Sequence, residues 1–535
     1  MKNFLYRVRR RLDREVALQS NHLRINKLTR MIESSVCQSE QSPIVLFNAS
    51  TRLSGLSQNA GFSLLTSLAL RADGVPVIHF VCDHGLSPCV LGTDRDDPAA
   101  SPPCRECVRT SRFAYAGADV HWFSHHNNPE LEDQLDGLDL SHLLTFEFQH
   151  IPLGKLILPS MRWILRRHHL QDHADNRFLA RAYILSAWNV YSEFSLLLAS
   201  CSPQAVVVFN GMFYPEALAR LAAHEKGLPV YSHEVGMLPY SAFFTEREAT
   251  AYPVAVDNNF QLNEDQDARL DQYLANRFQG KFQTAGVKFW PEMKQLDRAI
   301  SEKAASYRAL VPIFTNVIFD TSQSHANILF EHMFDWLNLV IEKIKQHPEI
   351  LFIIRAHPDE VRPGKESRES VAEWYDANHL SDIHQLVFIP PDEFVSSYDL
   401  IQRAKFVMVY NSTVGLEASI MGKPVLCAGK ARYTQIPTVF FPDTRKEYEN
   451  LLIGFLAHDN FEQPQRFVRN ARRVLYSQLF RASIPFDQYL EEDGVWRGYV
   501  KFKDFNLEDL MRERSDVVKV VLDGILKEKP FIRDL

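Results

Sequence analysis

Short apolar runs alternate with amphipathic stretches in the first half of the chain. Apolar runs at 43–50 (PIVLFNAS) and 75–83 (VPVIHFVCD) predict buried strands, and the amphipathic stretch between them predicts a helix. The same order of strand, helix and strand returns at 204–211 (QAVVVFNG), 214–227 (YPEALARLAAHEKG) and 228–236 (LPVYSHEVG). Because units of this kind join parallel strands, we expect a parallel sheet in the first half.

The second half repeats this pattern after a polar and charged connection. A long amphipathic helix is predicted at 328–348 and a shorter one at 414–423. Strands are predicted around them at 309–317, 350–358, 385–391, 404–413 and 424–429. Strands that alternate with helices twice over predict an α/β protein with two Rossmann-like, doubly wound domains.

Changes in pattern set the predicted domain boundaries. Residues 1–40 form a basic, amphipathic helical segment, and 41–300 form an N-terminal Rossmann-like domain with a helical insertion. Residues 301–500 form a C-terminal Rossmann-like domain, and 501–535 form a C-terminal helix. A chain of 535 residues is too long for one ordinary core, which agrees with two domains.

The net charge of the chain is −7, which argues against a nucleic-acid-binding protein. No apolar run reaches the length of about 18 residues that predicts a transmembrane helix. Near the N-terminus, no apolar core precedes a small-residue cleavage site of the secretory type. We therefore expect a cytoplasmic protein.

The first 31 residues differ from the rest in charge, because nine lysines and arginines stand against two acidic residues, a balance of +7. Phe4, Leu5, Val8, Leu12 and Val16 recur beside this charge at helical spacing. A helix of this kind suits an anionic membrane surface, so one interpretation is peripheral contact with the inner face of the cytoplasmic membrane. The other is a helix packed on the body with its arginines in solvent.

Polar side chains stand where several predicted strands end. Asn210, Glu234, His357 and the run Asn411-Ser412-Thr413 all follow apolar runs. In doubly wound domains, ligands bind at the carboxyl ends of the strands. We therefore expect these side chains to face a central cleft between the two domains.

Asn411, Ser412 and Thr413 stand directly before a predicted helix that begins at about Val414. A helix N-terminus has backbone N–H groups without partners and a partial positive charge, and hydroxyls add further donors. The run therefore predicts an anion site, such as a nucleotide phosphate would occupy. The alternative is an ordinary N-cap.

Arg355 and His357 follow a neighbouring strand and are expected to point to the same side if the strand persists. His357 can then donate a hydrogen bond to a phosphate oxygen, with Arg355 beside it. The alternatives are a histidine satisfied in the core and an arginine in a domain salt bridge. Glu417, in the following helix, can accept hydrogen bonds from ribose hydroxyls or only complement the helix dipole.

The motif RAHPDE at 355–360, followed by NSTVGLEASIMGKPV at 411–425, resembles the bacterial capsule polysaccharide glycosyltransferases, including the capsule Kdo transferases. The stretches 314–322 and 208–236 are similar to this group as well. The resemblance implies the GT-B architecture, with two Rossmann-like domains around a cleft. It also implies that His357, Ser412 and Thr413 bind the phosphate of a donor nucleotide.

Glycosyl transfer needs a base for the acceptor hydroxyl. Glu234 is the predicted base, with His233 as the alternative, and His357 completes the predicted catalytic pair. Asn210, Gly211 and His233 are expected to contact the acceptor. Because the helix start, His357 and Arg355 can stabilise a leaving phosphate, we expect no catalytic metal and no cofactor other than the donor substrate.

The sequence thus predicts an inverting, metal-independent glycosyltransferase. Its donor is a nucleotide sugar, with CMP-Kdo or a similar CMP-linked acidic sugar as the leading candidate, and its acceptor is a surface polysaccharide or a lipid-linked glycan. One alternative is a glycerophosphotransferase of the CDP-glycerol type. Another is a non-catalytic assembly protein that binds nucleotides or glycans.

Four cysteines, Cys82, Cys89, Cys104 and Cys107, lie within 26 residues. Cys104 and Cys107 have the C-x2-C spacing of zinc ligands, whereas the other spacings are irregular. Two interpretations stay open: a thiolate-bound metal such as zinc, and a chance cluster of buried thiols.

Overall fold

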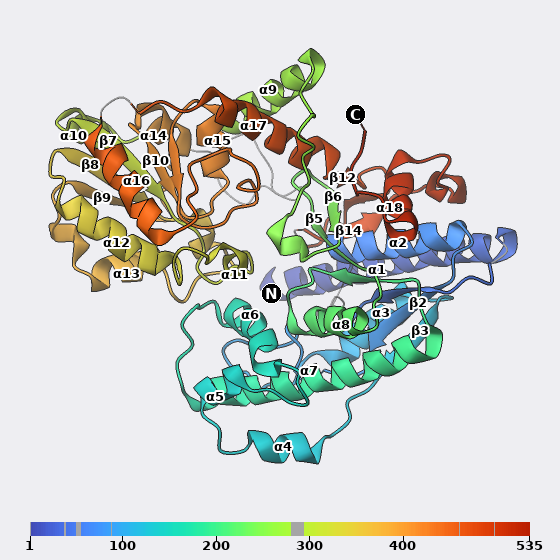
Figure 1. Ribbon diagram of the computed structural model, residues 1–535. Helices are drawn as coiled ribbons and strands as arrows, with labels where there is room; N and C mark the ends of the chain where they lie inside the picture. Colours follow the sequence, from blue (N-terminus) through green and yellow to red (C-terminus); the bar gives the residue numbers. More distant parts are fainter. Residues whose placement is uncertain are drawn as a thin grey trace.

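The computed structural model describes residues 2–36, 39–49, 55–86, 88–279, 294–458, 461–496 and 498–534. Two α/β units make up the body of the protein, and each is built on one mostly parallel sheet (Figure 1). The prediction of two doubly wound, Rossmann-like α/β domains is therefore confirmed.

The N-terminal unit contains a seven-stranded sheet with the order β12-β6-β5-β4-β1-β2-β3. β1 to β5 are parallel, whereas β6 and β12 are antiparallel to their neighbours. The strands are β1 (Ile44–Phe47), β2 (Val77–Cys82), β3 (Asp119–Phe123), β4 (Ala205–Phe209), β5 (Val230–Val235), β6 (Ser241–Thr245) and β12 (Ile484–Pro485).

Helices cover both faces of this sheet. Successive residues of its strands point to opposite faces, and the residues on both faces are apolar. Ile44 and Leu46 pack with one set of helices, and Val45 and Phe47 pack with the other. The first set is α1 (Lys2–Ser35), α2 (Gln58–Ala72) and α18 (Asp516–Lys527), with α3 (Cys104–Ala114) beside α1. The second set is α4 (Pro129–Leu135), α5 (Leu140–Thr145), α6 (Leu153–Leu165), α7 (Ala174–Cys201) and α8 (Tyr214–Glu225).

The C-terminal unit contains a parallel five-stranded sheet with the order β11-β10-β7-β8-β9. Its strands are β7 (Ala309–Phe314), β8 (Ile350–Arg355), β9 (Leu386–Ile389), β10 (Val407–Val409) and β11 (Val425–Cys427). One face packs against α11 (Gln323–Ala326), α12 (Met333–Lys345), α13 (Val371–Ala377) and α16 (Arg445–Ala457). The other packs against α9 (Glu264–Phe278), α10 (Arg298–Ala305), α14 (Ser397–Arg403), α15 (Val414–Ile420) and α17 (Gln465–Tyr476).

The chain returns to the N-terminal unit after α17. β12 pairs with β6, and the hairpin of β13 (Leu490–Glu492) and β14 (Val500–Phe502) packs with α1 and α2. Figure 1 shows these segments, in red, beside the blue α2. The last part of the predicted 301–500 domain therefore lies with the N-terminal unit, because β12 supplies an edge strand there. The predicted C-terminal helix is α18, and a single 3-10 turn (Leu507–Leu510) precedes it.

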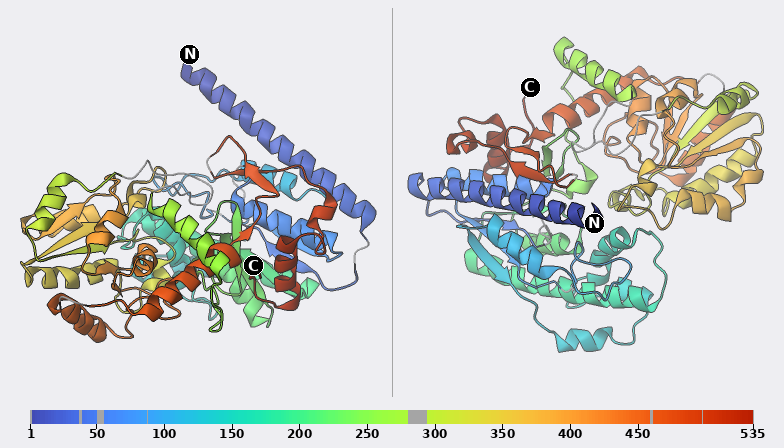
Figure 2. Two further views of the ribbon diagram at one scale, coloured as in Figure 1. Left: turned by 90° about the horizontal axis from the view of Figure 1, so that it is seen from above. Right: turned by 180° about the vertical axis from the view of Figure 1, so that it is seen from behind.

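The predicted N-terminal helical segment is a single helix, α1, whose two halves have different surroundings. Leu18, Ile25, Leu28 and Ile32 are buried in the N-terminal unit. The preceding turns project beyond the body (Figure 2, left). There Val8, Leu12 and Val16 are exposed, Leu12 and Val16 by 61% and 68%; the side chains of Phe4 and Leu5 lie outside the described residues.

Among the described residues, none of the helices combines the length and the apolar character needed to cross a lipid bilayer.

Candidate functional site

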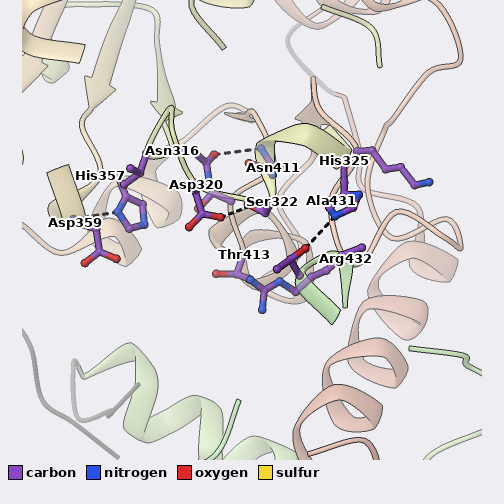
Figure 3. Close-up of a pocket in the computed structure, with 15 residues that line it drawn as sticks. Asn316, Asp320, Ser322, His325, His357, Asp359, Asn411, Thr413, Ala431 and Arg432 are labelled. Atoms are coloured by element: carbon purple, nitrogen blue, oxygen red, sulfur yellow. Dashed lines mark hydrogen bonds between the residues drawn. The ribbon is translucent and has the colours of Figure 1, made fainter. Parts of the chain in front are cut away.

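A polar pocket of about 290 Å³ lies at the carboxyl edge of the C-terminal sheet, where the N-terminal unit faces it. We call it the interdomain pocket. Figure 3 shows that its lining residues come from several segments of the chain that lie side by side. Its lining residues are Thr250, Ala251, Asn316, Val317, Asp320, Ser322, His325, His357, Asp359, Asn411, Ser412, Thr413, Lys430, Ala431 and Arg432.

The pocket is built from the segments that follow four of the five strands of this sheet. These segments come after β7, β8, β10 and β11, and the short helical turn Ala249–Ala251 of the N-terminal unit adds two further lining residues. Parallel strands bring their carboxyl ends to one edge, so residues far apart in sequence meet there. The expected site at the strand ends is thus a real concavity of a size near the lower end of small-molecule sites, roughly 300–1,000 Å³.

His357 lines the pocket in a defined tautomer. The backbone N–H of Asp359 donates a hydrogen bond to its Nδ1 at 3.1 Å, so this nitrogen has no proton. Burial lowers the pKa of His357, which favours the neutral ring. The neutral ring therefore carries its hydrogen on Nε2, where it can be donated to an anion.

The segment Asn411-Ser412-Thr413 lines the pocket directly before α15. The side-chain oxygen of Asn316 accepts a hydrogen bond from the backbone N–H of Asn411 at 3.3 Å, and the Tyr433 hydroxyl donates to the Ser412 carbonyl at 2.6 Å. Ser412 is buried, at 6% exposure. These contacts fix the backbone that carries the hydroxyls of Ser412 and Thr413 at the pocket wall. The helix that follows, α15, is short and runs from Val414 to Ile420.

Two cations of the pocket, Lys430 and Arg432, were not singled out in the sequence. Both follow β11, and neither forms an ion pair with another described residue. The Arg432 guanidinium lies over the ring of Tyr252 from the N-terminal unit, 4.5 Å from its centroid. Positive charge, hydroxyls and a histidine N–H together form an environment suited to a phosphate group.

Arg355 does not line the pocket. Its guanidinium is buried and donates to the carbonyl oxygens of Val395 at 3.0 Å and Ala356 at 3.4 Å. β8 ends at Arg355, and a 3-10 turn begins at Pro358. The strand alternation that would have placed Arg355 and His357 on one side therefore does not continue to His357.

Glu417 lies within the C-terminal unit rather than on the pocket wall. It is 2% exposed, and Tyr398 donates a hydrogen bond to its Oε2 at 2.7 Å. Its Oε1 accepts from the Nε of Arg277. Both carboxylate oxygens are therefore engaged by protein groups.

Glu234 is the next-to-last residue of β5 in the N-terminal unit and is held by a set of hydrogen bonds. Its Oε1 accepts from the side-chain amide of Asn59 at 2.7 Å and from the backbone N–H of Val235 at 2.8 Å, and its Oε2 accepts from the side-chain amide of Asn210 at 3.2 Å. Burial raises the pKa of Glu234, although these donors oppose the rise. A held carboxylate with a raised pKa is suited to accepting a proton.

The predicted acceptor residues around Glu234 have different surroundings. Asn210, at a positive φ of 60°, contacts Glu234, and Gly211 follows at a φ of 80° with Ser232 so near that a side chain has no room. His233 is 2% exposed and packs against Phe244 with the rings tilted and their centroids 5.5 Å apart. Alternation along β5 thus directs His233 into the core.

Tyr252 connects Glu234 with the interdomain pocket. Its hydroxyl donates a hydrogen bond to the carbonyl of Val235, and its ring contacts Arg432. Burial, and after it the carboxylates of Glu234 and Asp320, raise the pKa of Tyr252. Neither Glu234 nor Tyr252 lines the pocket, but Tyr252 contacts both the residue after Glu234 and the lining residue Arg432.

The four clustered cysteines line a separate small cavity of about 20 Å³. Burial raises the pKa of the Cys82 thiol to about 11, which disfavours a thiolate in this arrangement. Within the described ranges, no three His, Cys, Asp or Glu side chains are placed to hold one metal ion. The four side chains are partly buried, and whether they bind a metal stays open.

Sequence reasoning missed Asn316, Asp320, His325, Lys430 and Arg432. Each follows β7 or β11 in the structure, so the rule that named Asn411 and His357 also applies to the ends of these two strands. Thr250 had no such signal, because it reaches the pocket through the packing of the two units.

The one matching family model lies in the half of the chain that holds the pocket. Residues 268–437 match the family described as "Capsule polysaccharide biosynthesis protein", and this range includes every pocket residue of the C-terminal unit. Protein FixF of Sinorhizobium fredii is 31% identical over 101 residues, which are 19% of this chain and 21% of that protein. The match thus spans about a fifth of FixF.

Solved structures with similarity include two of KpsC from Thermosulfurimonas dismutans. The beta Kdo 2,4 transferase is 15% identical with a TM-score of 0.34, over 51% of this chain and 79% of that one. The beta Kdo 2,7 transferase is 14% identical with a TM-score of 0.30, over 63% and 90%. The UDP-GlcNAc 2-epimerase from Neisseria meningitidis is 12% identical with a TM-score of 0.23, over 81% and 98%. The resemblance to capsule polysaccharide biosynthesis proteins that the motifs indicated is thus confirmed for residues 268–437 of this chain.

Proposed function

We propose that this protein is an inverting, metal-independent glycosyltransferase that uses a nucleotide sugar. The observation that carries the proposal is the interdomain pocket, in which a neutral histidine, two hydroxyls and two cations surround one space at the strand ends. The donor's phosphate occupies this space, and its sugar faces the N-terminal unit. The leading donor is CMP-Kdo or a similar CMP-linked acidic sugar, and the acceptor is a surface polysaccharide or a lipid-linked glycan.

The reaction in this account is a single displacement. Glu234 takes the proton of an acceptor hydroxyl while the hydroxyl oxygen attacks the anomeric carbon. The bond between this carbon and the phosphate oxygen breaks with inversion, and the nucleotide leaves with the bonding electrons. His357 Nε2–H, the hydroxyls of Ser412 and Thr413, and the two cations stabilise the charge that develops on the phosphate.

Nucleotide binding is the first test. Calorimetry against CMP, CDP, UDP, GDP and ADP should show one preferred base, and Arg432→Ala should weaken that binding. Lys430→Ala should weaken it too, whereas Lys446→Ala, which removes an exposed lysine of α16, should leave it unchanged. Failure of all five nucleotides to bind would overturn the proposal.

Turnover is the second test, because it separates the functional classes. Incubation with the sugar nucleotides of the preferred base should release the nucleotide and transfer the sugar, or hydrolyse the donor slowly without an acceptor. Turnover of CDP-glycerol instead would assign a glycerophosphotransferase. Binding without turnover of any donor would assign a non-catalytic protein.

We also propose that the projecting half of α1 contacts an anionic membrane surface, where lipid-linked acceptors are found. Val8, Leu12 and Val16 lie four residues apart on one exposed side of the helix, with Arg9 and Arg11 exposed beside them. Arg14 is not part of this surface because it is paired with Glu106 of α3. Apolar contact and charge attraction together favour binding to such a surface.

A further inference from the structure

The carboxylate of Glu234 is held asymmetrically. Oε1 accepts two hydrogen bonds, from Asn59 at 2.7 Å and Val235 at 2.8 Å, whereas Oε2 accepts one, from Asn210 at 3.2 Å. A carboxylate oxygen has about two lone-pair sites. Both sites of Oε1 are therefore occupied, whereas Oε2 keeps one acceptor site that no other described residue uses.

Asn59 reaches this carboxylate from a different element. It lies in the first turn of α2, and the Ser57 side chain caps that turn by accepting from the backbone N–H of Ala60 at 3.2 Å. α2 packs against β5, which brings Asn59 to the end of the strand that holds Glu234. Because a carboxylate only accepts, the amide group must present its nitrogen to Oε1.

We propose that Asn59 is a positioning residue of the active site: it holds Oε1 of Glu234 and thereby leaves Oε2 as the oxygen that takes the acceptor's proton. This inference rests on the proposed role of Glu234 as the base. Asn59 does not touch the substrate in this account. It acts by fixing the carboxylate plane and by stabilising its ionised form.

Hydrogen bonding to the ionised form explains the expected effect of removing Asn59. Burial raises the pKa of Glu234, and the amide donors oppose that rise. Without the amide of Asn59 the pKa rises further, so a smaller fraction of the base is ionised at neutral pH. A side chain that only filled space would not change this titration.

The first experiment measures the titration directly and does not depend on activity. Glutamate labelled with ¹³C at the carboxyl carbon gives an NMR signal that moves with pH, and Glu234→Gln identifies the signal of Glu234. In Asn59→Ala its midpoint should rise by about one pH unit, the size expected for one hydrogen bond to a charged group. Asn59→Asp keeps the shape of the side chain and should raise it further, because two close carboxylates cannot both ionise readily.

The second experiment compares the pH dependence of kcat/KM in the same variants. The pKa at the acidic side of the kcat/KM profile should rise together with the NMR midpoint. Raising the pH should therefore restore most of the rate in Asn59→Ala. Ser57→Ala is the matched control: it weakens the same helix start, leaves the amide in place and should not move this pKa.

An unchanged NMR midpoint in both Asn59 variants would overturn the inference, whatever the activity of the protein. A midpoint that moves while the pKa of the kcat/KM profile stays would also overturn it, because Glu234 would then not be the base. A wild-type protein that titrates as expected but turns over no donor would locate the failure in the proposed function instead.

Discussion

Arg277 on α9 forms a buried ion pair with Glu417 on α15, through its Nε and the carboxylate Oε1. Glu417 follows the pocket segment Asn411-Ser412-Thr413 by one helical turn, so the pair ties α9 to the start of the pocket wall. Breaking a buried pair leaves one charge without compensation, which is costly.

The first prediction follows from this pair. Glu417→Leu should reduce the free energy of unfolding by about 3–5 kcal/mol, because it removes the carboxylate that compensates the charge of Arg277. Denaturant melts measure the loss. Nucleotide affinity, measured well below the melting temperature, should stay near normal. A large loss of affinity with normal stability would instead indicate the ribose contact that the sequence suggested.

The second prediction concerns His357. His357→Ala should weaken nucleotide binding by about 1–3 kcal/mol, the range for losing one hydrogen bond to a charged group. Calorimetry measures the change, and His458→Ala, which removes an exposed histidine of the same unit, is the control. Equal affinities for wild type and His357→Ala, with the fold intact, would remove His357 from the phosphate site.

The third prediction concerns pH and the contact between the two units. Burial, and after it Arg162, His169 and His332, lower the pKa of His168 to about 3. A histidine in the unfolded chain has a pKa of about 6.5, so below that pH the unfolded state binds a proton that the folded state does not. Stability should therefore fall as the pH drops from about 6.5, by about 1.4 kcal/mol per pH unit for this one group.

Urea melts between neutral pH and about pH 5 measure this dependence. His168→Gln should make the loss of stability with falling pH shallower, whereas His142→Gln, on the exposed side of α5, should not. Identical slopes for wild type and His168→Gln would show that this histidine is not the group responsible.

The fourth prediction concerns α1. Leu12→Glu and Val16→Glu should reduce sedimentation with anionic liposomes, because they replace exposed apolar side chains with negative charge. Binding of the wild type should also weaken with added salt. Stability should stay near normal, since both side chains are in solvent. Liposome binding that is unchanged in both variants would exclude this surface as the membrane contact.

Much of the fold was predictable because strands that are buried on both faces appear in the sequence as short apolar runs. The runs that became β1, β4, β8 and β10 are almost wholly apolar, as strands covered on both faces require. The return of β12 to the first sheet was not predictable, because two residues carry no period. Its place is set by the packing of distant segments.

The site was predictable where a motif coincides with a strand end. His357 and Asn411-Ser412-Thr413 meet in the interdomain pocket because β8 and β10 end at the same edge. Arg355 and Glu417 lie elsewhere, since the direction of a side chain depends on where a strand or helix ends. Asn59 was not predictable, because no local pattern reports its contact with Glu234.

Glu234→Gln tests the central claim most directly, because it removes the base and preserves the shape of the side chain. Donor affinity should stay normal, while the rate of sugar transfer should fall by about 10²–10⁴-fold, the usual contribution of general-base catalysis. Glu246→Gln, an exposed change in the loop after β6, should leave both quantities unchanged. Near-normal transfer by Glu234→Gln, with the donor bound normally, would contradict the account.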